Sequence, residues 1–304
     1  MAAQPRAGPH SDTLAATAGC GAILLKLQRV EGIVLRTRPF SETSLVGALF
    51  TRQLGKIGVI ARGARRPGRM AAAAFQPTNI ITCSVYLHER SGLRTISNLE
   101  LEAVHESIPH VPQVFGLAGY ALELVISQVP DEDPAPRVFS LLKGFLGALN
   151  AGSLRDAERV VLTFELRLQR ALGYGLRTDA CPRCGGPVGA SRALSLRGGG
   201  IVCAACAPHD ACQETVCEED LAALRAMLAE PDAQWARQVV SPETTARLVR
   251  IARNAWEMHA PVPVRSSSLS FLAELRGGAY GERSTVRSPS PTGIPDQSAS
   301  SDRA

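Results

Sequence analysis

Short apolar runs alternate with turn-forming residues in the first third of the chain. Five runs rich in Val, Ile, Leu and Thr lie between residues 32 and 101, and they read GIVLRTRPF, TSLVGALFT, KIGVIARGA, NIITCSVYLHE and LRTISNLEL. The segments between them are SE, RQLG, a long Arg/Ala/Pro loop and RSG. Runs of this length and composition, separated by such residues, favour β-strands. We therefore predict five strands in this region.

Five strands in about 70 residues suit a small β-barrel of the OB type, whose outer face and loops commonly bind single-stranded nucleic acid. A small antiparallel sandwich is the alternative, and the pattern of apolar residues is compatible with both. The predicted fold class is α+β, because the pattern changes after this region.

Beyond Pro112 the apolar residues recur every three or four positions, which is typical of amphipathic helices. Helices are predicted in QVFGLAGYALELVISQV, APRVFSLLKGFLGALN, SLRDAERVVLTFELRLQRALG, EEDLAALRAMLAE and SPETTARLVRIARNAWEMH. Ser153 and Asp156 stand in a capping-box relation at the start of the third helix. Ser241 is the expected cap of the fifth, with Pro242 at its first position. We expect these helices to pack against one another.

The ends of the chain have a different composition. Residues 1–25 are rich in Ala, Gly, Pro, Ser and Thr, and residues 277–304 are rich in Ser, Gly and Pro, so neither segment offers a core. The expected organisation is a disordered extension at 1–25, an OB-fold nucleic-acid-binding domain at 26–106, a helical domain at 107–276 with a zinc ribbon at 178–212, and a disordered tail at 277–304.

Positive charge is concentrated in the predicted barrel. The chain of 304 residues has a net charge of +5. Residues 26–105 contain twelve Lys and Arg against five Glu and no Asp, a balance of 12 − 5 = +7, so the remainder carries 5 − 7 = −2. A local positive field of this kind indicates a polyanionic partner.

No Asp or Glu occurs from residue 43 to residue 88, although this interval contains five arginines and one lysine. An exposed surface usually mixes charges of both signs, so a solvated face explains the interval less well than a nucleic-acid site does. Arginine also suits phosphate, because its planar group matches the phosphate oxygens and stacks on bases. Aromatic residues are few here, at Phe40, Phe50, Phe75 and Tyr86. The candidate DNA-binding residues are Arg36, Arg38, Lys56, Arg62, Arg65, Arg66 and Arg69.

Four of the eight cysteines form two CxxC pairs separated by 18 residues. Cys181 and Cys184 make the first pair and Cys203 and Cys206 the second, a spacing that predicts a zinc ribbon with one Zn²⁺ per chain. Four thiolates leave no coordination position open for water, so a structural site is favoured over a catalytic one. Two redox CxxC motifs or coincidence remain possible on spacing alone. His209 or Cys212 could also replace one ligand.

No catalytic motif is present. The chain has no G-x-x-x-x-G-K-[ST] phosphate loop, no H-E-x-x-H and no G-x-S-x-G, and its six histidines are dispersed. It also has no run of 18 apolar residues and no secretory signal pattern. We therefore expect a cytoplasmic protein, not an enzyme, with no membrane partner.

Three separated motifs resemble the RecO family of bacterial DNA repair proteins. The stretch EGIVLRTRPFSETSLVGALFTRQLGKIGVIARGARRP, with FQP after it, is similar to the N-terminal domain of that family. ALGYGLRTDACPRCG is similar to its helix-to-zinc junction and VRSSSLSFLAEL to its C-terminal end. The resemblance covers residues 26–275. By motif, the family's Ser-Glu-Thr falls on residues 41–43, its Ala-Arg-Gly-Ala-Arg on residues 61–65, and its zinc ligands on the four cysteines of the CxxC pairs.

The resemblance implies a non-enzymatic recombination mediator associated with the nucleoid. Members of the family bind single- and double-stranded DNA and anneal complementary strands. With the partner RecR they help to load the RecA recombinase onto strands coated by single-strand-binding protein. An RNA-binding assembly factor with the same barrel is the main rival function, and a zinc-ribbon enzyme acting on nucleotides is a weaker one.

Overall fold

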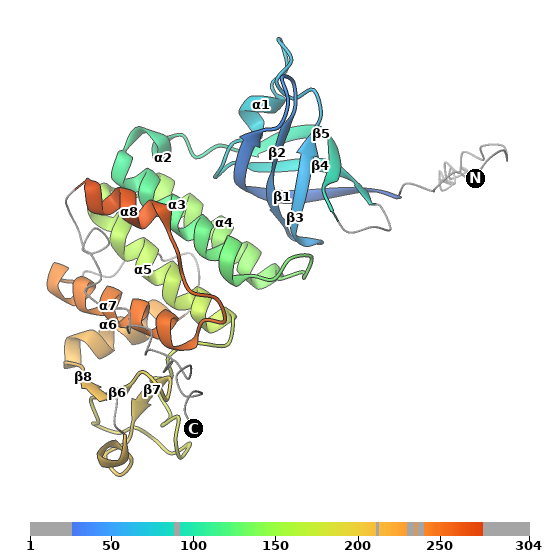
Figure 1. The fold of residues 1–304 in the computed structure, drawn as a ribbon. Helices are drawn as coiled ribbons and strands as arrows, with labels where there is room; N and C mark the ends of the chain where they lie inside the picture. The colour runs from blue at the N-terminus through green and yellow to red at the C-terminus, as the bar shows by residue number, and fades with distance from the viewer. Residues whose placement is uncertain (1–25, 88–91, 211–212, 230–234, 236–239, 276–304) are drawn as a thin grey trace, which may run out of the picture.

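The computed structural model describes residues 26–87, 92–210, 213–229, 235 and 240–275 (Figure 1). The segments expected to be a disordered extension and a disordered tail lie outside these residues. A β-barrel lies at one end of the molecule and a helical domain beside it, and a small three-stranded sheet lies at the far end of the helices.

The five predicted strands are present and close into a barrel in the order β1-β2-β3-β5-β4. Their bounds are β1 (Lys26–Pro39), β2 (Leu45–Thr51), β3 (Gly55–Ala61), β4 (Ile80–Leu87) and β5 (Arg94–Ala103). All pairings are antiparallel except that of β3 with β5, which closes the barrel in parallel. A short helix, α1 (Ala71–Ala74), follows β3. The OB-type prediction is confirmed, and the sandwich alternative is excluded.

Strand β1 has 14 residues and bends, so it pairs with two neighbouring strands. A β-bulge between Val34 and Arg36 shifts its register against β2, while its first half pairs with β4. Val34 points into the barrel core with Leu49 and Phe75. On the other face Ile33 and Leu35 belong to the core of the helical domain. The alternating pattern of β1 therefore fills the barrel and also joins it to the helices.

Helix α5 is the centre of the helical domain. It contacts α3, α4, α6 and α7, and its Phe164 is completely buried. The helices of the domain are α2 (Ser107–His110), α3 (Pro112–Gln128), α4 (Pro136–Ala151), α5 (Leu154–Ala171), α6 (Glu218–Leu228), α7 (Pro242–His259) and α8 (Ser267–Glu274). The five helices predicted from apolar periodicity are all present. Among the helices that the structure describes, none combines the length and apolar character needed to cross a bilayer.

The observed helix caps agree with the prediction for α7 and differ from it for α5. Ser241 accepts a hydrogen bond from the backbone N–H of Thr244 and caps α7, as expected. Ser153 instead donates its hydroxyl to the carboxylate of Asp156 at 2.7 Å and makes no side-chain cap. A capping box forms where none was predicted, between Cys217 and Asp220 of α6.

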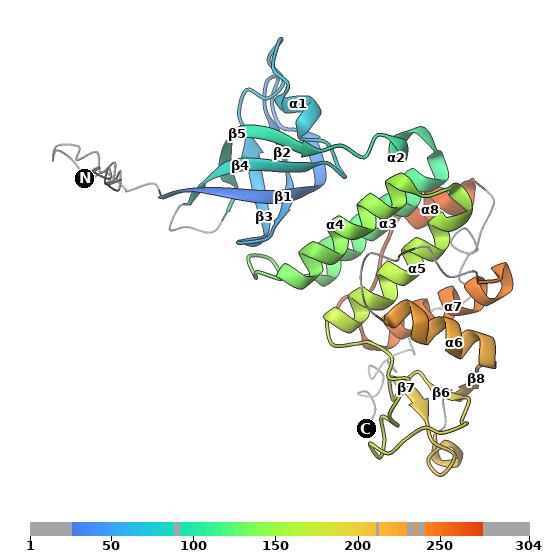
Figure 2. The same cartoon turned by 180° about the vertical axis from the view of Figure 1, so that it is seen from behind.

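Apolar side chains of the barrel and of the helices belong to one buried cluster. Figure 2 shows from behind how the barrel lies beside α3 and α4. Phe50 of β2 packs on Phe139 of α4 with 5.8 Å between ring centroids. Arg52 lies over the same Phe139 ring at 5.0 Å. At the β2–β3 turn, Gly55 has φ +67° and its α-carbon lies so close to the backbone of Asp133 that a β-carbon would clash. The barrel is therefore held firmly against the helical domain.

Candidate nucleic-acid interface and metal centre

The segment from Arg62 to Met70, here called the arginine loop, joins β3 to α1. It projects from the barrel beyond α1 in Figure 1, on the side away from the small three-stranded sheet. Four arginines lie on it, and the side chains of all four are exposed: Arg62, Arg65, Arg66 and Arg69. The strand end predicted in this region is therefore followed by a solvent-facing basic loop.

The arginine loop is fastened to the turn between β1 and β2. The backbone N–H of Arg65 donates to the carbonyl of Thr43 at 2.9 Å, and its guanidinium donates to the carbonyl of Ser41 at 3.3 Å. The same turn is closed by the N–H of Phe40, which donates to the carbonyl of Ser44 at 3.0 Å. In OB folds this turn and the outer face of strands 2 and 3 are the usual binding surfaces.

Arg36 and Arg38 lie at the second half of β1, opposite Ala48 and Val46 of β2. Both arginines are exposed and line a groove of about 690 Å³ that runs over the outer face of β1, β2 and β3 to the end of α3. A side chain at Gly47 would clash with the backbone of Arg36, so the strands approach closely under the groove. The sequence predicted these two arginines as candidates without placing them on this face.

Lys56 and Arg52 do not belong with the unpaired cations, contrary to the interpretation of the acid-free interval. Lys56 is 8% exposed; its ammonium donates to the carbonyl of Ile126 and pairs with Asp131 at 3.2 Å. Arg52 pairs with Glu31 at 3.7 Å. The acids that neutralise them come from outside the interval, so counting charges along the sequence could not find them.

The other basic candidates have no acidic partner among the residues that the structure describes. The acids at the end of the groove are already neutralised, since Asp131 pairs with Lys56 and Glu132 pairs with Arg94 at 3.0 Å. The exposed set consists of Arg36, Arg38, Arg62, Arg65, Arg66 and Arg69. It lies on the strands and loops of one side of the barrel, where it can neutralise a phosphate backbone.

Lys56→Met is expected to lower the free energy of unfolding by about 1–3 kcal/mol, because it removes a charged hydrogen bond between the barrel and α3. It should leave the salt dependence of DNA affinity unchanged, since the ammonium does not face solvent. Arg38→Met is the matched control. It should leave the free energy of unfolding unchanged and should flatten the salt dependence of DNA affinity. Chemical denaturation and binding titrations at several salt concentrations measure both. A flatter salt dependence for Lys56→Met would show that Lys56 contacts DNA after all.

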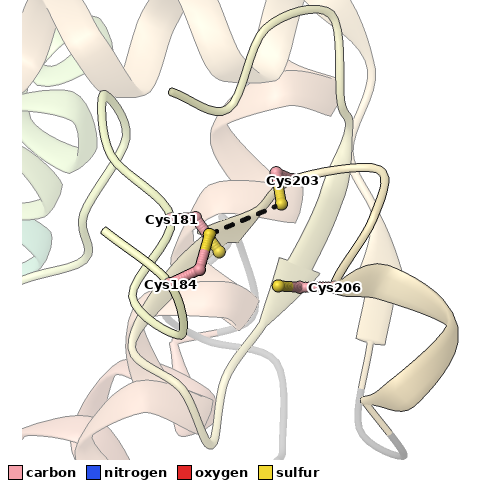
Figure 3. A group of neighbouring side chains, drawn as sticks. All are labelled: Cys181, Cys184, Cys203 and Cys206. Atoms are coloured by element: carbon pink, nitrogen blue, oxygen red, sulfur yellow. Dashed lines mark hydrogen bonds between the residues drawn. The ribbon is translucent and has the colours of Figure 1, made fainter. Parts of the chain in front are cut away.

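The four cysteines of the CxxC pairs converge at the small sheet (Figure 3). Their sulfur atoms all lie within 4.8 Å of one another, and the sulfurs of Cys184 and Cys203 are 3.8 Å apart. A tetrahedral ion with metal–sulfur bonds of about 2.3 Å would separate its sulfurs by about 3.8 Å. The arrangement therefore fits a tetrahedral metal ion with four thiolate ligands.

Two turns and a hairpin deliver these sulfurs. The first turn follows Cys181, whose carbonyl accepts the N–H of Gly185 at 2.8 Å, and Gly185 adopts φ +74°. The second turn begins at Cys203, directly after the hairpin of β6 (Ala193–Ser195) and β7 (Gly200–Val202). A third strand, β8 (Gln213–Thr215), pairs with β6 and was not predicted.

The electrostatics of the cluster favour a cation. A backbone hydrogen bond from Cys203 is the main cause that lowers the pKa of Cys181 to about 6. A hydrogen bond with the side chain of Cys203 is the main cause that raises the pKa of Cys206 to about 12. The first thiolate thus forms readily, whereas further negative charge accumulates at a cost that a bound dication removes.

The alternative ligand sets receive no support. The group of metal-ligating side chains found in the described part of the chain contains the four cysteines and not His209. His209 lies on a short 3₁₀ turn, η1 (Ala207–His209), where its carbonyl accepts a hydrogen bond from Arg183 at 2.7 Å. Cys212 lies outside the described residues. The ligand set predicted from the two CxxC pairs is the one that the structure brings together.

Family models match most of the chain. The model described as Recombination protein O N terminal matches residues 25–104, which include the barrel with its basic groove. The model described as Recombination protein O C terminal matches residues 112–268, which include the metal cluster. The chain belongs to the RecO family. The resemblance found in the sequence motifs is confirmed.

Curated RecO proteins are similar over much of their length. A DNA repair protein RecO of Geobacter metallireducens is 32% identical over 249 residues, which cover 81% of this chain and 97% of that protein. The RecO protein of Geobacter sulfurreducens is 31% identical over 249 residues, covering 81% and 98%. That of Frankia casuarinae is 33% identical over 189 residues, covering 62% and 76%. The chain therefore contains nearly the whole length of its Geobacter relatives.

Proposed function

We propose that the protein is a DNA-binding recombination mediator with no catalytic activity of its own. The observation that carries this proposal is the set of six exposed arginines on the binding side of an OB-type barrel, with no acidic partner in the described part of the chain. Such a surface binds phosphates independently of base sequence. It therefore suits both single- and double-stranded DNA, and DNA binding would place the protein at the nucleoid.

The proposed activity is the annealing of complementary strands and, with RecR, assistance in loading RecA onto DNA coated by single-strand-binding protein. Neutralising phosphates supports annealing, because two strands repel each other until their charge is screened. The names of the relatives, DNA repair protein RecO, support a role in repair.

Strand annealing in the presence of single-strand-binding protein, with and without RecR, tests this function. We expect the protein to accelerate annealing of coated complementary strands, and RecR to change the rate or the amount of RecA that assembles. Annealing no faster than the spontaneous rate, at low salt and with naked strands, would contradict the proposal.

We infer that the metal is a single structural Zn²⁺ held by Cys181, Cys184, Cys203 and Cys206. Four thiolates in a tetrahedral arrangement are typical of zinc, and they leave no position for a reactive water. The ion would hold the two CxxC turns together beneath α6 and α7. A closed site of this kind also disfavours the rival function of a zinc-dependent enzyme acting on nucleotides.

Removal of residues 277–304 is expected to leave DNA affinity within about tenfold of the full chain, roughly 1.4 kcal/mol. This segment contains only three cations, Arg283, Arg287 and Arg303, and lacks the apolar residues of a core. Fluorescence anisotropy with a labelled oligonucleotide measures the affinity of both forms. A larger loss would assign part of the DNA-binding surface to the tail.

Competition between single-stranded DNA and RNA for the full chain separates the proposal from an RNA-binding role, in which RNA would bind more tightly.

A further inference from the structure

Phe40 exposes an aromatic ring beside the basic surface. Its exposed fraction is 61%, whereas Phe50 and Phe75 of the same barrel are completely buried. Met70, at the end of the arginine loop, is 76% exposed. Single exposed apolar residues are common on proteins. An exposed aromatic ring within a group of unneutralised arginines is a more specific combination, since nucleic-acid sites are built from these two kinds of side chain.

The backbone that carries Phe40 is well fixed. Phe40 directly follows the last residue of β1, and its N–H is bonded to the carbonyl of Ser44 across the turn. The arginine loop holds the same turn through two bonds of Arg65, one to Thr43 and one to Ser41. The backbone position of Phe40 is therefore defined, and the neighbouring cations lie at the end of β1, at Arg38, and on the arginine loop.

We propose that Phe40 is a platform on which an unpaired DNA base stacks while the surrounding arginines bind the adjoining phosphates. This inference rests on the proposed DNA binding and adds which form of DNA the site selects. Bases in a duplex are already stacked on their neighbours and paired, so they cannot cover the ring without being displaced. Single-stranded bases present free faces, and stacking on an aromatic ring tolerates any sequence. Phe40 therefore adds affinity for single strands only.

The charge of the surroundings identifies this occupant. Arg38 precedes Phe40 by two residues on β1, and Arg65 contacts the carbonyl of Ser41, which follows it. In the described part of the chain no acid pairs with either arginine. A polyanion with flat apolar groups along its length complements both features of the surface, and single-stranded DNA has this chemistry.

The test compares Phe40→Ala with the unmodified full-length protein on three probes of equal length: a labelled oligothymidine, an abasic oligomer with the same phosphates, and a duplex. We expect oligothymidine binding to weaken about tenfold. Affinity for the abasic oligomer and the duplex should stay within about twofold, because the arginines are intact. The salt dependence of oligothymidine affinity should also be unchanged.

Two further variants separate stacking from general packing. Phe40→Trp should keep or increase oligothymidine affinity, and its fluorescence should be quenched when a base stacks on the new ring. Trp235 and Trp256 are both buried, so they should contribute little to this change in fluorescence. Phe40→Leu, which keeps apolar bulk without an aromatic face, should behave like Phe40→Ala. Leu154→Ala on α5 is a control for loss of an exposed apolar residue elsewhere and should have no effect.

Equal oligothymidine affinity for Phe40→Ala and the unmodified protein would overturn the inference while leaving DNA binding intact. Equal losses on all three probes would also overturn it, because they would indicate damage to the basic loops. A loss confined to RecR-dependent activity would assign Phe40 to a protein contact instead. If the unmodified protein bound none of the probes, the proposed function itself would fail.

Discussion

Replacing Cys184 with serine is expected to abolish stoichiometric metal binding and to unfold the metal-binding ribbon around β6 and β7. The sulfur of Cys184 lies 3.8 Å from that of Cys203, and the sulfurs of the two CxxC turns all lie within 4.8 Å of one another. In small zinc modules metal binding contributes on the order of 10 kcal/mol or more to folding. A hydroxyl is a poor zinc ligand, so most of this contribution is lost.

The damage should reach the helices that the ribbon touches. His259 at the end of α7 bonds through its ring to the carbonyl of Leu196, 2.6 Å away, and Arg250 of α7 bonds Glu214 of β8 at 3.1 Å. We therefore expect a lower melting temperature for the helical domain as well as loss of metal. Elemental analysis and thermal denaturation, each with and without a chelator, measure the two effects.

Cys217→Ser is the matched control for this prediction. Cys217 is an exposed thiol at the N-cap of α6, outside the metal cluster, and serine is a good N-cap residue. This variant should retain one metal ion per chain and melt close to the unmodified protein. If Cys184→Ser kept its metal and its stability while the control did the same, the four-cysteine site would be wrong.

Replacing Arg66 and Arg69 together with alanine is expected to weaken DNA binding at physiological salt and to slow strand annealing markedly. Both side chains are exposed on the arginine loop and take part in no ion pair that the structure shows among the described residues. Each phosphate neutralised on a single strand contributes about 0.7 to the slope of log affinity against log salt. Losing two contacts should therefore flatten the slope by about 1.4 units.

Folding should survive this double substitution, because it alters an exposed loop and not the core. The melting temperature is expected to remain within a few degrees. Arg65 is kept in this variant, since its guanidinium also holds the carbonyl of Ser41.

The charge-matched control replaces Arg155 of α5 and Arg197 between β6 and β7, two exposed arginines outside the barrel. It lowers the net charge equally, so a flatter slope in both variants would indicate a general charge effect and not a site on the barrel. Unchanged slope and annealing rate for Arg66→Ala with Arg69→Ala would remove the central support for DNA binding at this loop.

Much of the architecture was predictable because its signals are local. Strand and helix periodicity follow from which residues face a core, and the five strands and five main helices appear where these patterns lie. The metal cluster was predictable because each CxxC pair is a local turn, and a hairpin brings the two turns together. The short strand β8 escaped prediction, since three residues carry too little pattern.

The sequence by itself determined the order of elements, the concentration of positive charge in the barrel and the four metal ligands, because each depends on neighbours in the chain. Only the tertiary structure decided which cations remain available. Lys56 looks like a free cation in an acid-free stretch, yet folding pairs it with Asp131, 75 residues later in the chain. Phe40 and Phe50 are likewise the same residue type in the sequence, but barrel closure and packing on α4 bury Phe50 and leave Phe40 on the surface. Burial and ion pairing depend on contacts between distant segments, and those contacts exist only once the chain has folded.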